Sequence, residues 1–453
     1  MKIGQWIVIA IATVAASLFG TEATAAPPSG ESLFPQETFV YFSIRNAPGV
    51  ARQWKRSQLG KLLADPSMKP FGDHLRKLIR ERWSDAGAKL GLTWDDLRQL
   101  PVGEIAVGII PDAAGKSSAV FLADVTGNEQ QTQTALAKAG KGLVDAGAKR
   151  KTLAVGGLQA VAFDLPKNRG VVLYFIKDGL LVVSESTRTA EGILKRWNGD
   201  GKGSLKSASE YQRVVRYCEQ RRPGMKPDVA WFVRPPSAAK ARRARLAAAP
   251  PTTKTKGDFL TLLEQAGFAQ IRAIGAFHNF DLERFDSFYR LAIVAPGSPA
   301  KAMRMLKFPT GGNHEPLVWT PEQVSSHSRF NWKVAEAFDG FGNVFDAYLK
   351  EPGAFEDILQ SMKEDEEDPF DLRGELVARL GTRTTLLSDY TTPVTTISRR
   401  SLAAIECTDP VALQNALYKL LKKDPEVEIR NFRGHRVFEM HDSQPPPVPG
   451  AGA

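Results

Sequence analysis

Cysteine is scarce in this chain of 453 residues, which contains only Cys218 and Cys407. Two cysteines cannot build the dense disulfide framework that stabilises small secreted domains. A single bridge stays open as an alternative, although Cys218 falls in a helix-like stretch and Cys407 at the end of a predicted strand. The fold must therefore depend on a hydrophobic core, and 43% hydrophobic residues is an ordinary proportion for a globular protein.

Metal-binding patterns are also lacking. The six histidines show neither H-x-H nor H-E-x-x-H spacing, and the segment HEPLV has Val318 where a zinc protease needs its second histidine. The acidic run KEDEEDPFD, from Lys363 to Asp371, lacks the alternating ligands and the central glycine of a calcium loop. We therefore predict no metal site and interpret the acidic run as a solvated loop between helices, with weak calcium binding as the alternative.

Two segments match only part of a known catalytic motif. The segment GKSS, residues 115–118, would need a glycine at position 110 to form a phosphate-binding loop, and Ile110 stands there. The segment SAAK, which begins at Ser237, matches the S-x-x-K pattern of penicillin-binding enzymes but lies in low-complexity sequence and lacks the later S-D-N element. The sequence therefore predicts no catalytic residue and no cofactor.

One apolar run stands out, from Trp6 to Phe19, after Lys2 and before the small-residue pattern Ala23-Thr24-Ala25. This order is typical of a secretory signal peptide, and we expect cleavage between Ala25 and Ala26. The run is shorter than the roughly 20 residues of a spanning helix, although an uncleaved anchor stays the alternative. We therefore predict export to the periplasm or outer envelope of a bacterium, with no transmembrane span in the mature chain.

The formal net charge of +10 favours acidic partners, such as an anionic glycan or a lipid surface. Export makes nucleic acid the least expected of them. Four cations, Lys240, Arg242, Arg243 and Arg245, lie together in KARRAR and are candidate contacts to an anionic surface. The alternative is that this run is only a solvated linker.

Alternating apolar strands and helical stretches predict an α+β fold. In VVLYFIKDGLLVVSES, the pair Asp178-Gly179 between two apolar runs indicates a tight hairpin. Helical spacing brings Leu136, Leu143 and Val144 to one face of another segment. We expect modules of antiparallel sheet with helices packed on one face.

The last third of the chain repeats the pattern of the first. FDLRGELVARLGTRTTLLSDY parallels TWDDLRQLPVGEIAVGII, and SLAAIECTD parallels SAVFLADVT, at an offset of about 280 positions. In the repeat, Asp409 caps a helix that has Pro410 in its first turn. This constant offset predicts an internal duplication.

These patterns predict four segments: a signal peptide (1–25), a first α+β module (26–225), a smaller middle unit (226–310) with an Ala, Pro and basic insertion (235–257), and a second α+β module (311–453). The strand that ends at Met440 is followed by a Pro-rich stretch, where the first module continues with a hairpin and a helix. We expect the second module to be incomplete at its C-terminus, because an uncovered strand edge is an aggregation hazard. A disordered tail is the alternative.

Three segments carry a resemblance: FVYFSIRNAPGVARQWKRSQLGKLLADPSMKPF, DLRGELVARLGTRTTLLSDYTTP and RRSLAAIECTDPVAL. They resemble a large family of exported bacterial proteins that is recorded only as a domain of unknown function. The resemblance extends from about Phe34 to Met440 and rests on patterns of strands and helices. It implies a further strand pair beyond the Pro-rich stretch, and it carries over no catalytic residue.

We interpret the protein as a non-enzymatic binding or structural component of the cell envelope, with an envelope protein, an anionic glycan or a lipid surface as partner. Two alternatives stay open. One is an envelope hydrolase whose site is assembled across modules, and the other is a carrier of an apolar ligand held between sheet and helices.

Overall fold

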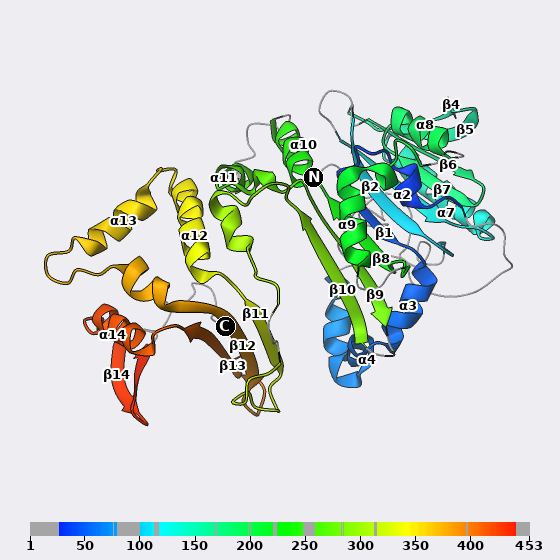
Figure 1. The fold of residues 1–453 in the computed structure, drawn as a ribbon. Coiled ribbons are helices and arrows are strands. Elements are labelled where there is room, and N and C mark those ends of the chain that lie inside the picture. Colours follow the sequence, from blue (N-terminus) through cyan, green and yellow to red (C-terminus); the bar gives the residue numbers. More distant parts are fainter. Residues whose placement is uncertain are drawn as a thin grey trace. The chain divides into compact units, whose positions relative to one another are not determined.

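The chain forms two compact units in a computed structural model (Figure 1). Unit 1 comprises Met1–Lys254 and Ile271–Pro296, and unit 2 comprises Thr255–Gln270 and Gly297–Ala453. The structure describes residues 27–75, 77–78, 100–112, 117–167, 170–197, 199, 201–220, 224–247, 259–281, 283, 285–311, 315–395 and 397–440. Helices and antiparallel sheets occur in both units, so the α+β class is confirmed.

Unit 1 is built on a ten-stranded antiparallel sheet with the order β10-β9-β8-β1-β2-β3-β7-β6-β5-β4. Its strands are β1 (Val40–Ile44), β2 (Ile105–Pro111), β3 (Ser117–Asp124), β4 (Lys149–Val155), β5 (Leu158–Asp164), β6 (Val171–Lys177), β7 (Leu180–Ser184), β8 (Val229–Val233), β9 (Ala273–Asp281) and β10 (Phe285–Val294). The predicted hairpin joins β6 to β7, where Asp178 (φ 47) and Gly179 (φ 74) both adopt the left-handed conformation of a tight turn.

The helices of unit 1 begin where the sequence provides caps. Asn46 accepts the N–H of Gly49 at the start of α3, and Ser186 accepts that of Thr189 at the start of α8. The helical segments are α2 (Gly30–Leu33), α3 (Ala47–Arg56), α4 (Gln58–Ala64), η1 (Pro66–Met68), α7 (Glu129–Asp145), α8 (Thr187–Arg196), η3 (Leu205–Ser207), α9 (Ser209–Glu219) and α10 (Pro235–Ala247).

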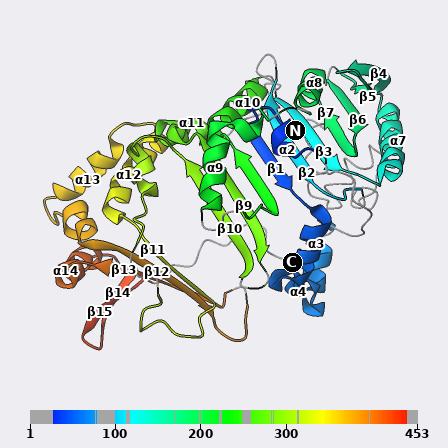
Figure 2. The same ribbon diagram turned by 45° about the vertical axis from the view of Figure 1, so that its right-hand side comes forward.

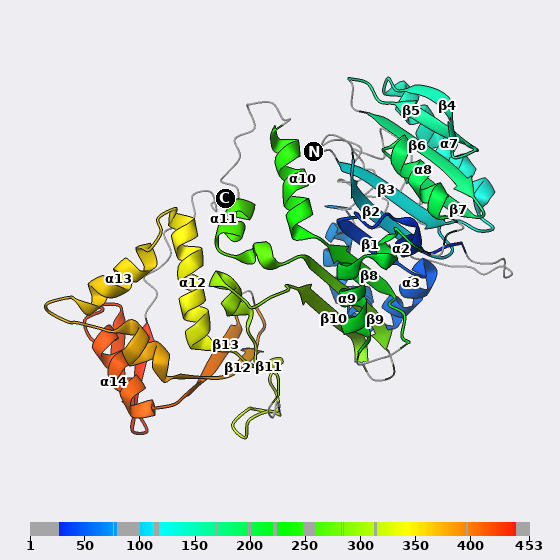
Figure 3. The ribbon, with the colours of Figure 1, turned by 45° about the horizontal axis from the view of Figure 1, so that its top comes forward.

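Helices pack on both faces of this sheet, not only on the single face that the sequence suggested. Side chains alternate along β3, so Leu122 faces one core with Ile193 of α8 and Val214 of α9. Phe121 faces the other core, with Ala135 of α7. Figure 3 shows α8 and α7 on opposite sides of these strands.

Unit 2 contains two smaller antiparallel sheets, β11-β12-β13 and β14-β15. Its elements are α11 (Phe259–Gln265), η4 (Phe268–Gln270), η5 (Lys301–Leu306), β11 (Ser326–Asn331), α12 (Val334–Leu349), α13 (Ala354–Lys363), η6 (Leu372–Leu376), η7 (Val377–Arg379), β12 (Leu380–Tyr390), β13 (Arg399–Cys407), α14 (Pro410–Leu421), β14 (Val427–Phe432) and β15 (His435–Met440). The carboxylate of Asp409 caps α14, where it accepts the N–H of Ala412 at 3.0 Å.

The order of elements repeats between the units. Without the short η1, η6 and η7 segments, the described elements follow the order β1-α3-α4-β2-β3-α7-β4-β5 in unit 1, where residues 79–99 before β2 lie outside the description, and β11-α12-α13-β12-β13-α14-β14-β15 in unit 2. The central strands also pair alike, as β1-β2-β3 and β11-β12-β13. This is the arrangement that the predicted duplication requires.

The compact units do not follow the predicted boundaries. Residues 226–310 are not a separate middle unit, because β8 pairs with β1, and β9 and β10 extend the same sheet. Buried contacts such as that of Ala230 with its cross-strand partner Phe277 hold these strands in the sheet of unit 1. The predicted insertion 235–257 begins as a regular helix, α10, as far as Ala247.

Candidate functional site

A polar cluster joins the N-terminal helix α2 to the sheet of unit 1. The hydroxyl of Ser43 donates to Oε1 of Glu104 at 2.8 Å, and the hydroxyl of Tyr41 donates to the same oxygen at 3.4 Å. The other oxygen, Oε2, accepts the backbone N–H of Gly30 at 3.0 Å. Both carboxylate oxygens of Glu104 are therefore occupied by donors of the protein itself.

The polar cluster around Glu104 has a structural role. Tyr41 and Ser43 are 2% and 5% exposed, so neither hydroxyl is available to a substrate. Burial raises the pKa of Glu104, and burial also raises the pKa of Tyr41 well above its usual value. Tyr211 adds a hydrogen bond of 2.5 Å to Oε2 of Glu31. The cluster fixes α2 and α9 against the sheet.

The terminal strand β10 has a different character, because it exposes apolar side chains. Alternate residues Tyr289, Leu291 and Ile293 are 53%, 41% and 45% exposed. Within the part of the chain that the structure describes, no strand pairs with the outer edge of β10. A long edge strand with bare apolar side chains is a template for pairing with another polypeptide.

A groove runs beside this edge, between β10 and α9. It has a volume of about 480 Å³. Its walls are Arg213, Tyr217, Leu291, Ala292, Ile293, Val294, Ala295 and Pro296. Tyr217 on α9 is 58% exposed and Arg213 is exposed, so the groove has an apolar floor with one cation at its rim. Figure 2 shows α9 lying next to β9 and β10.

A buried arginine holds β10 in place from the opposite face. The guanidinium of Arg290, which is 8% exposed, donates from Nη2 to Oδ1 of Asn279 at 2.6 Å and from Nη1 to the carbonyl oxygen of Cys218. These bonds connect β10 to β9 and to α9. The exposed side chains of β10 therefore stand on a rigid strand, which suits a binding surface.

The two cysteines lie in different units and do not form a bridge. Cys218 is buried in unit 1, Cys407 is partly exposed in unit 2, and both are free thiols. Burial raises the pKa of the Cys218 thiol, which donates to the carbonyl oxygen of Arg290 at 3.5 Å. Its role is packing between α9 and β10.

The predicted basic contacts lie on α10, a helix without an acidic residue. Lys240 and Arg242 are exposed and Arg243 is partly buried, whereas the side chain of Arg245 lies outside the described residues. Lys240 and Arg243 are three positions apart and share one side of the helix, and Arg242 points away from them. The three cations whose side chains are described are therefore not gathered on one face of α10.

Charge reversal at Lys240 and Arg243, which share one side of α10, is expected to weaken binding of the protein to anionic lipid vesicles by at least about tenfold, because each cation near such a surface contributes about 1 kcal/mol. Vesicle cosedimentation measures the change. The matched control reverses Lys138 and Lys141 on α7. If both double variants weaken binding equally, net charge alone is responsible and α10 is not the contact.

Two carboxylates of the acidic run in unit 2, Asp368 and Asp371, form internal ion pairs. Asp368 contacts the ammonium groups of Lys422 and Lys423 at 3.3 and 3.2 Å. Asp371 contacts Lys363 at 2.8 Å and also accepts the N–H of Gly374. In the described ranges, no group of three or more His, Cys, Asp or Glu side chains is arranged to hold a metal ion.

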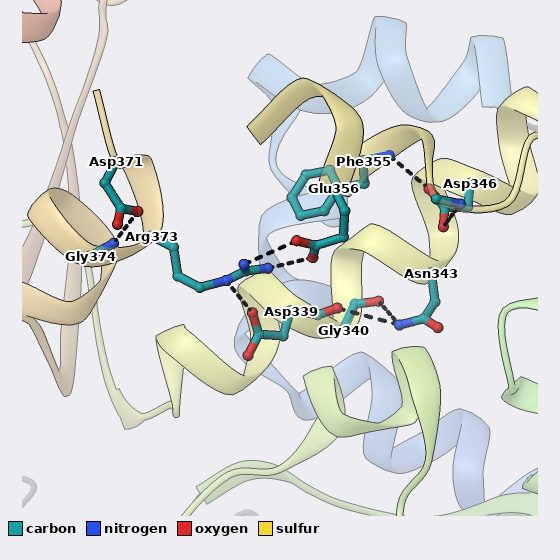
Figure 4. A network of polar contacts seen from close by, with 10 residues as sticks. Asp339, Gly340, Asn343, Asp346, Phe355, Glu356, Asp371, Arg373 and Gly374 are labelled. Atoms are coloured by element: carbon teal, nitrogen blue, oxygen red, sulfur yellow. Dashed lines mark hydrogen bonds and ion pairs between the residues drawn. The ribbon is translucent and has the colours of Figure 1, made fainter. Parts of the chain in front are cut away.

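A related network of polar contacts connects the helices of unit 2, as Figure 4 shows. The guanidinium of Arg373 binds both carboxylate oxygens of Glu356, at 3.1 and 2.5 Å, and Oδ1 of Asp339 at 3.0 Å. Asp346 accepts the N–H of Phe355 at 2.9 Å. These charges connect α12, α13 and η6, and they are partly exposed, so each pair contributes little to stability.

The predicted signal cleavage site, Ala25 and Ala26, lies outside the described residues. Across the described helices, none combines the length and the apolar character needed to cross a bilayer. Comparison with family models, with curated proteins and with solved structures gives no match.

The sequence did not single out the residues of the groove. Tyr217 lies in the helix-like stretch that contains Cys218, and Leu291 and Ile293 lie in FYRLAIVAPG, which has the pattern of a strand paired with IRAIGAFHNF. The alternation of Leu291 and Ile293 indicates only that one face of this strand is buried. The available signal was the alternate apolar set Tyr289, Leu291 and Ile293 in FYRLAIV, whose other set is apolar except for Arg290. This apolar pattern indicates an exposed surface only once β10 is known to be a terminal strand.

Proposed function

We propose that this protein is a non-enzymatic binding component of the cell envelope that binds an extended segment of a partner polypeptide along β10. The observation that carries the proposal is the terminal strand with three alternate exposed apolar side chains beside an apolar groove. Location in the envelope rests on the N-terminal segment of the sequence.

Strand addition would use both features of this edge. Main-chain hydrogen bonds to an edge strand supply affinity, and alternate side chains of the added strand enter neighbouring pockets and supply specificity. Leu291 and Ile293 would contact one set of side chains, and Tyr217 the other. Arg213 at the rim favours an acidic residue or a terminal carboxylate in the bound segment.

A carrier of an apolar ligand is the second candidate, since the volume of about 480 Å³ suits a small molecule. Such sites bury most of the ligand surface. Here the apolar walls are themselves about half exposed, with Tyr217 at 58% and Ile293 at 45%. An open groove along a strand edge fits an extended chain better than an enclosed small molecule.

Selection from a library of displayed random peptides tests the proposal. We expect the intact protein to enrich peptides that protect the amides of β10 from hydrogen exchange. The double variant Leu291→Lys, Ile293→Lys should bind them at least about tenfold more weakly, because edge lysines oppose strand pairing. Val144→Lys, at a 45% exposed position of α7, is the matched control. Enriched peptides that bind the double variant unchanged would refute the proposal.

A further inference from the structure

The helical segment that follows β1 in unit 1 exposes large apolar side chains in rows. In α4, Leu59 and Leu62 are 48% and 51% exposed, and they share one side of the helix because they lie three positions apart. In the next helix, which begins at Lys69, Phe71 and Leu75 are 54% and 41% exposed and share one side at a spacing of four. Single exposed apolar residues are ordinary, but two such rows in one segment indicate an interaction site.

Cations accompany these apolar rows. Residues 52–75 and 77–78, here called the basic helical segment, contain six Lys or Arg and two Asp, a net charge of +4. In its last helix, Lys69, Asp73 and Lys77 follow one another at a spacing of four, on the side opposite the apolar row. Lysine on one side and Phe or Leu on the other is the pattern of a helix that lies in the plane of a membrane surface.

The basic helical segment is anchored to the sheet of unit 1 through its backbone. The hydroxyl of Ser57, which is 2% exposed, accepts the N–H of Gly60 at 3.0 Å and caps α4. The carboxylate of Asp286 in β10 accepts the N–H of Gln58 at 2.7 Å, which connects the start of α4 to the sheet. Figure 1 shows α4 beside one end of β9 and β10. These contacts use backbone groups, so the exposed apolar side chains stay available at the surface.

The mixture of lysine and apolar residues favours a lipid surface over a partner protein. The centres of protein interfaces are depleted in lysine, whereas Lys61 stands between Leu59 and Leu62 in the sequence and is exposed as they are. A bilayer offers an apolar layer to Leu and Phe and, where its lipids are anionic, phosphate groups to lysine. Lysine side chains suit this boundary, because the hydrocarbon part can lie along the apolar layer while the ammonium group stays in water.

We propose that the basic helical segment is a membrane contact of unit 1, in which Leu62 and Phe71 enter the outer part of an anionic bilayer and the lysines contact its phosphate groups. The occupant is a lipid surface. This contact includes neither the exposed side chains of β10 nor the cations of α10, and it does not depend on the peptide site proposed above.

Vesicle binding and hydrogen exchange test this proposal on the full chain. We expect at least about tenfold tighter binding to vesicles of phosphatidylglycerol and phosphatidylcholine than to vesicles of phosphatidylcholine alone, because cations favour an anionic surface. The mixed vesicles should slow hydrogen exchange at the amides of residues 58–75 and leave those of β10 unchanged, which separates this contact from peptide binding. Equal binding to both vesicles, or unchanged exchange at residues 58–75, would overturn the proposal.

The double variant Leu62→Ser, Phe71→Ser keeps every charge and should bind the mixed vesicles at least about tenfold more weakly, because its apolar contacts with the bilayer are lost. The matched control Val144→Ser, Tyr348→Ser removes two exposed apolar side chains elsewhere and should bind like the wild type. Circular dichroism verifies that both variants are folded. Unchanged binding by the first variant would refute the contact, since charge alone would then suffice. So would a dimer of the protein that this variant dissociates, because a second copy would then be the occupant.

Discussion

Replacing Phe34 with alanine is expected to lower the free energy of unfolding of unit 1 by about 3–5 kcal/mol. Phe34 is fully buried, and its ring contacts that of Tyr41 edge to face, with 5.7 Å between the ring centroids. The ring also lies where a side chain of Gly108 would be, since a Cβ there would be 2.5 Å from it. The surrounding sheet cannot close over the cavity, so the loss lies in the upper range for core residues.

Hydrogen exchange during urea unfolding measures this loss separately for each unit, through peptides from β2 and β3 in unit 1 and from β12 in unit 2. The matched control is Phe71→Ala, at a position that is 54% exposed, which should change stability by less than about 0.5 kcal/mol. A loss below about 1 kcal/mol for Phe34→Ala would contradict the role of this ring in the core.

Replacing Glu104 with alanine is expected to lower the stability of unit 1 by about 2–4 kcal/mol at neutral pH, because Gly30 and Ser43 each lose the acceptor of a hydrogen bond. The loss depends on pH. Since burial raises the pKa of Glu104, the folded protein keeps this proton at a pH where the unfolded chain has already released it. The charged carboxylate of Glu104 therefore stabilises the fold less than the protonated carboxyl group does.

The raised pKa of Glu104 determines how this stability difference changes with pH. As the pH falls through the folded pKa of Glu104, the wild-type protein gains stability relative to Glu104→Ala, and the gap stops growing below the ordinary value of 4.5. Asp178→Asn is the control with the opposite sign, because Lys177 lowers the pKa of Asp178, and the advantage of the wild type shrinks on acidification. A gap for Glu104→Ala that narrows as the pH falls would show that its carboxylate is stabilised in the fold.

Local features of this fold were predictable where nearby residues decide them. The tight turn at Asp178-Gly179 needs two left-handed residues, and Asp and Gly adopt that conformation at little cost. The start of α14 needs an acceptor for its first free N–H groups, and Asp409 supplies one. Turns and helix caps of this kind depend on residues within a few positions of each other, so the sequence alone predicts them.

The groove was not predictable, because distant residues decide it. FYRLAIV is compatible with any antiparallel strand, and only its pairing with β9 makes it the last strand of the sheet. Whether Leu291 and Ile293 are covered depends on which helices pack on each face, and α9 covers only the opposite one. For the same reason, the sequence suggested a separate unit for residues 226–310, whose strands in fact continue the sheet of unit 1 from β1 through β8 and β9 to β10.

The sequence by itself determined the α+β class, the caps and turns, the repeated order of elements and the lack of a complete catalytic or metal-binding motif. Each of these depends on residue types and their spacing along the chain. Only the tertiary structure decided that β10 ends a ten-stranded sheet, that the carboxylate of Glu104 accepts hydrogen bonds from Ser43 and Gly30, and that Leu291 and Ile293 stay exposed. Exposure is a property of what packs against a residue, and that partner comes from elsewhere in the chain.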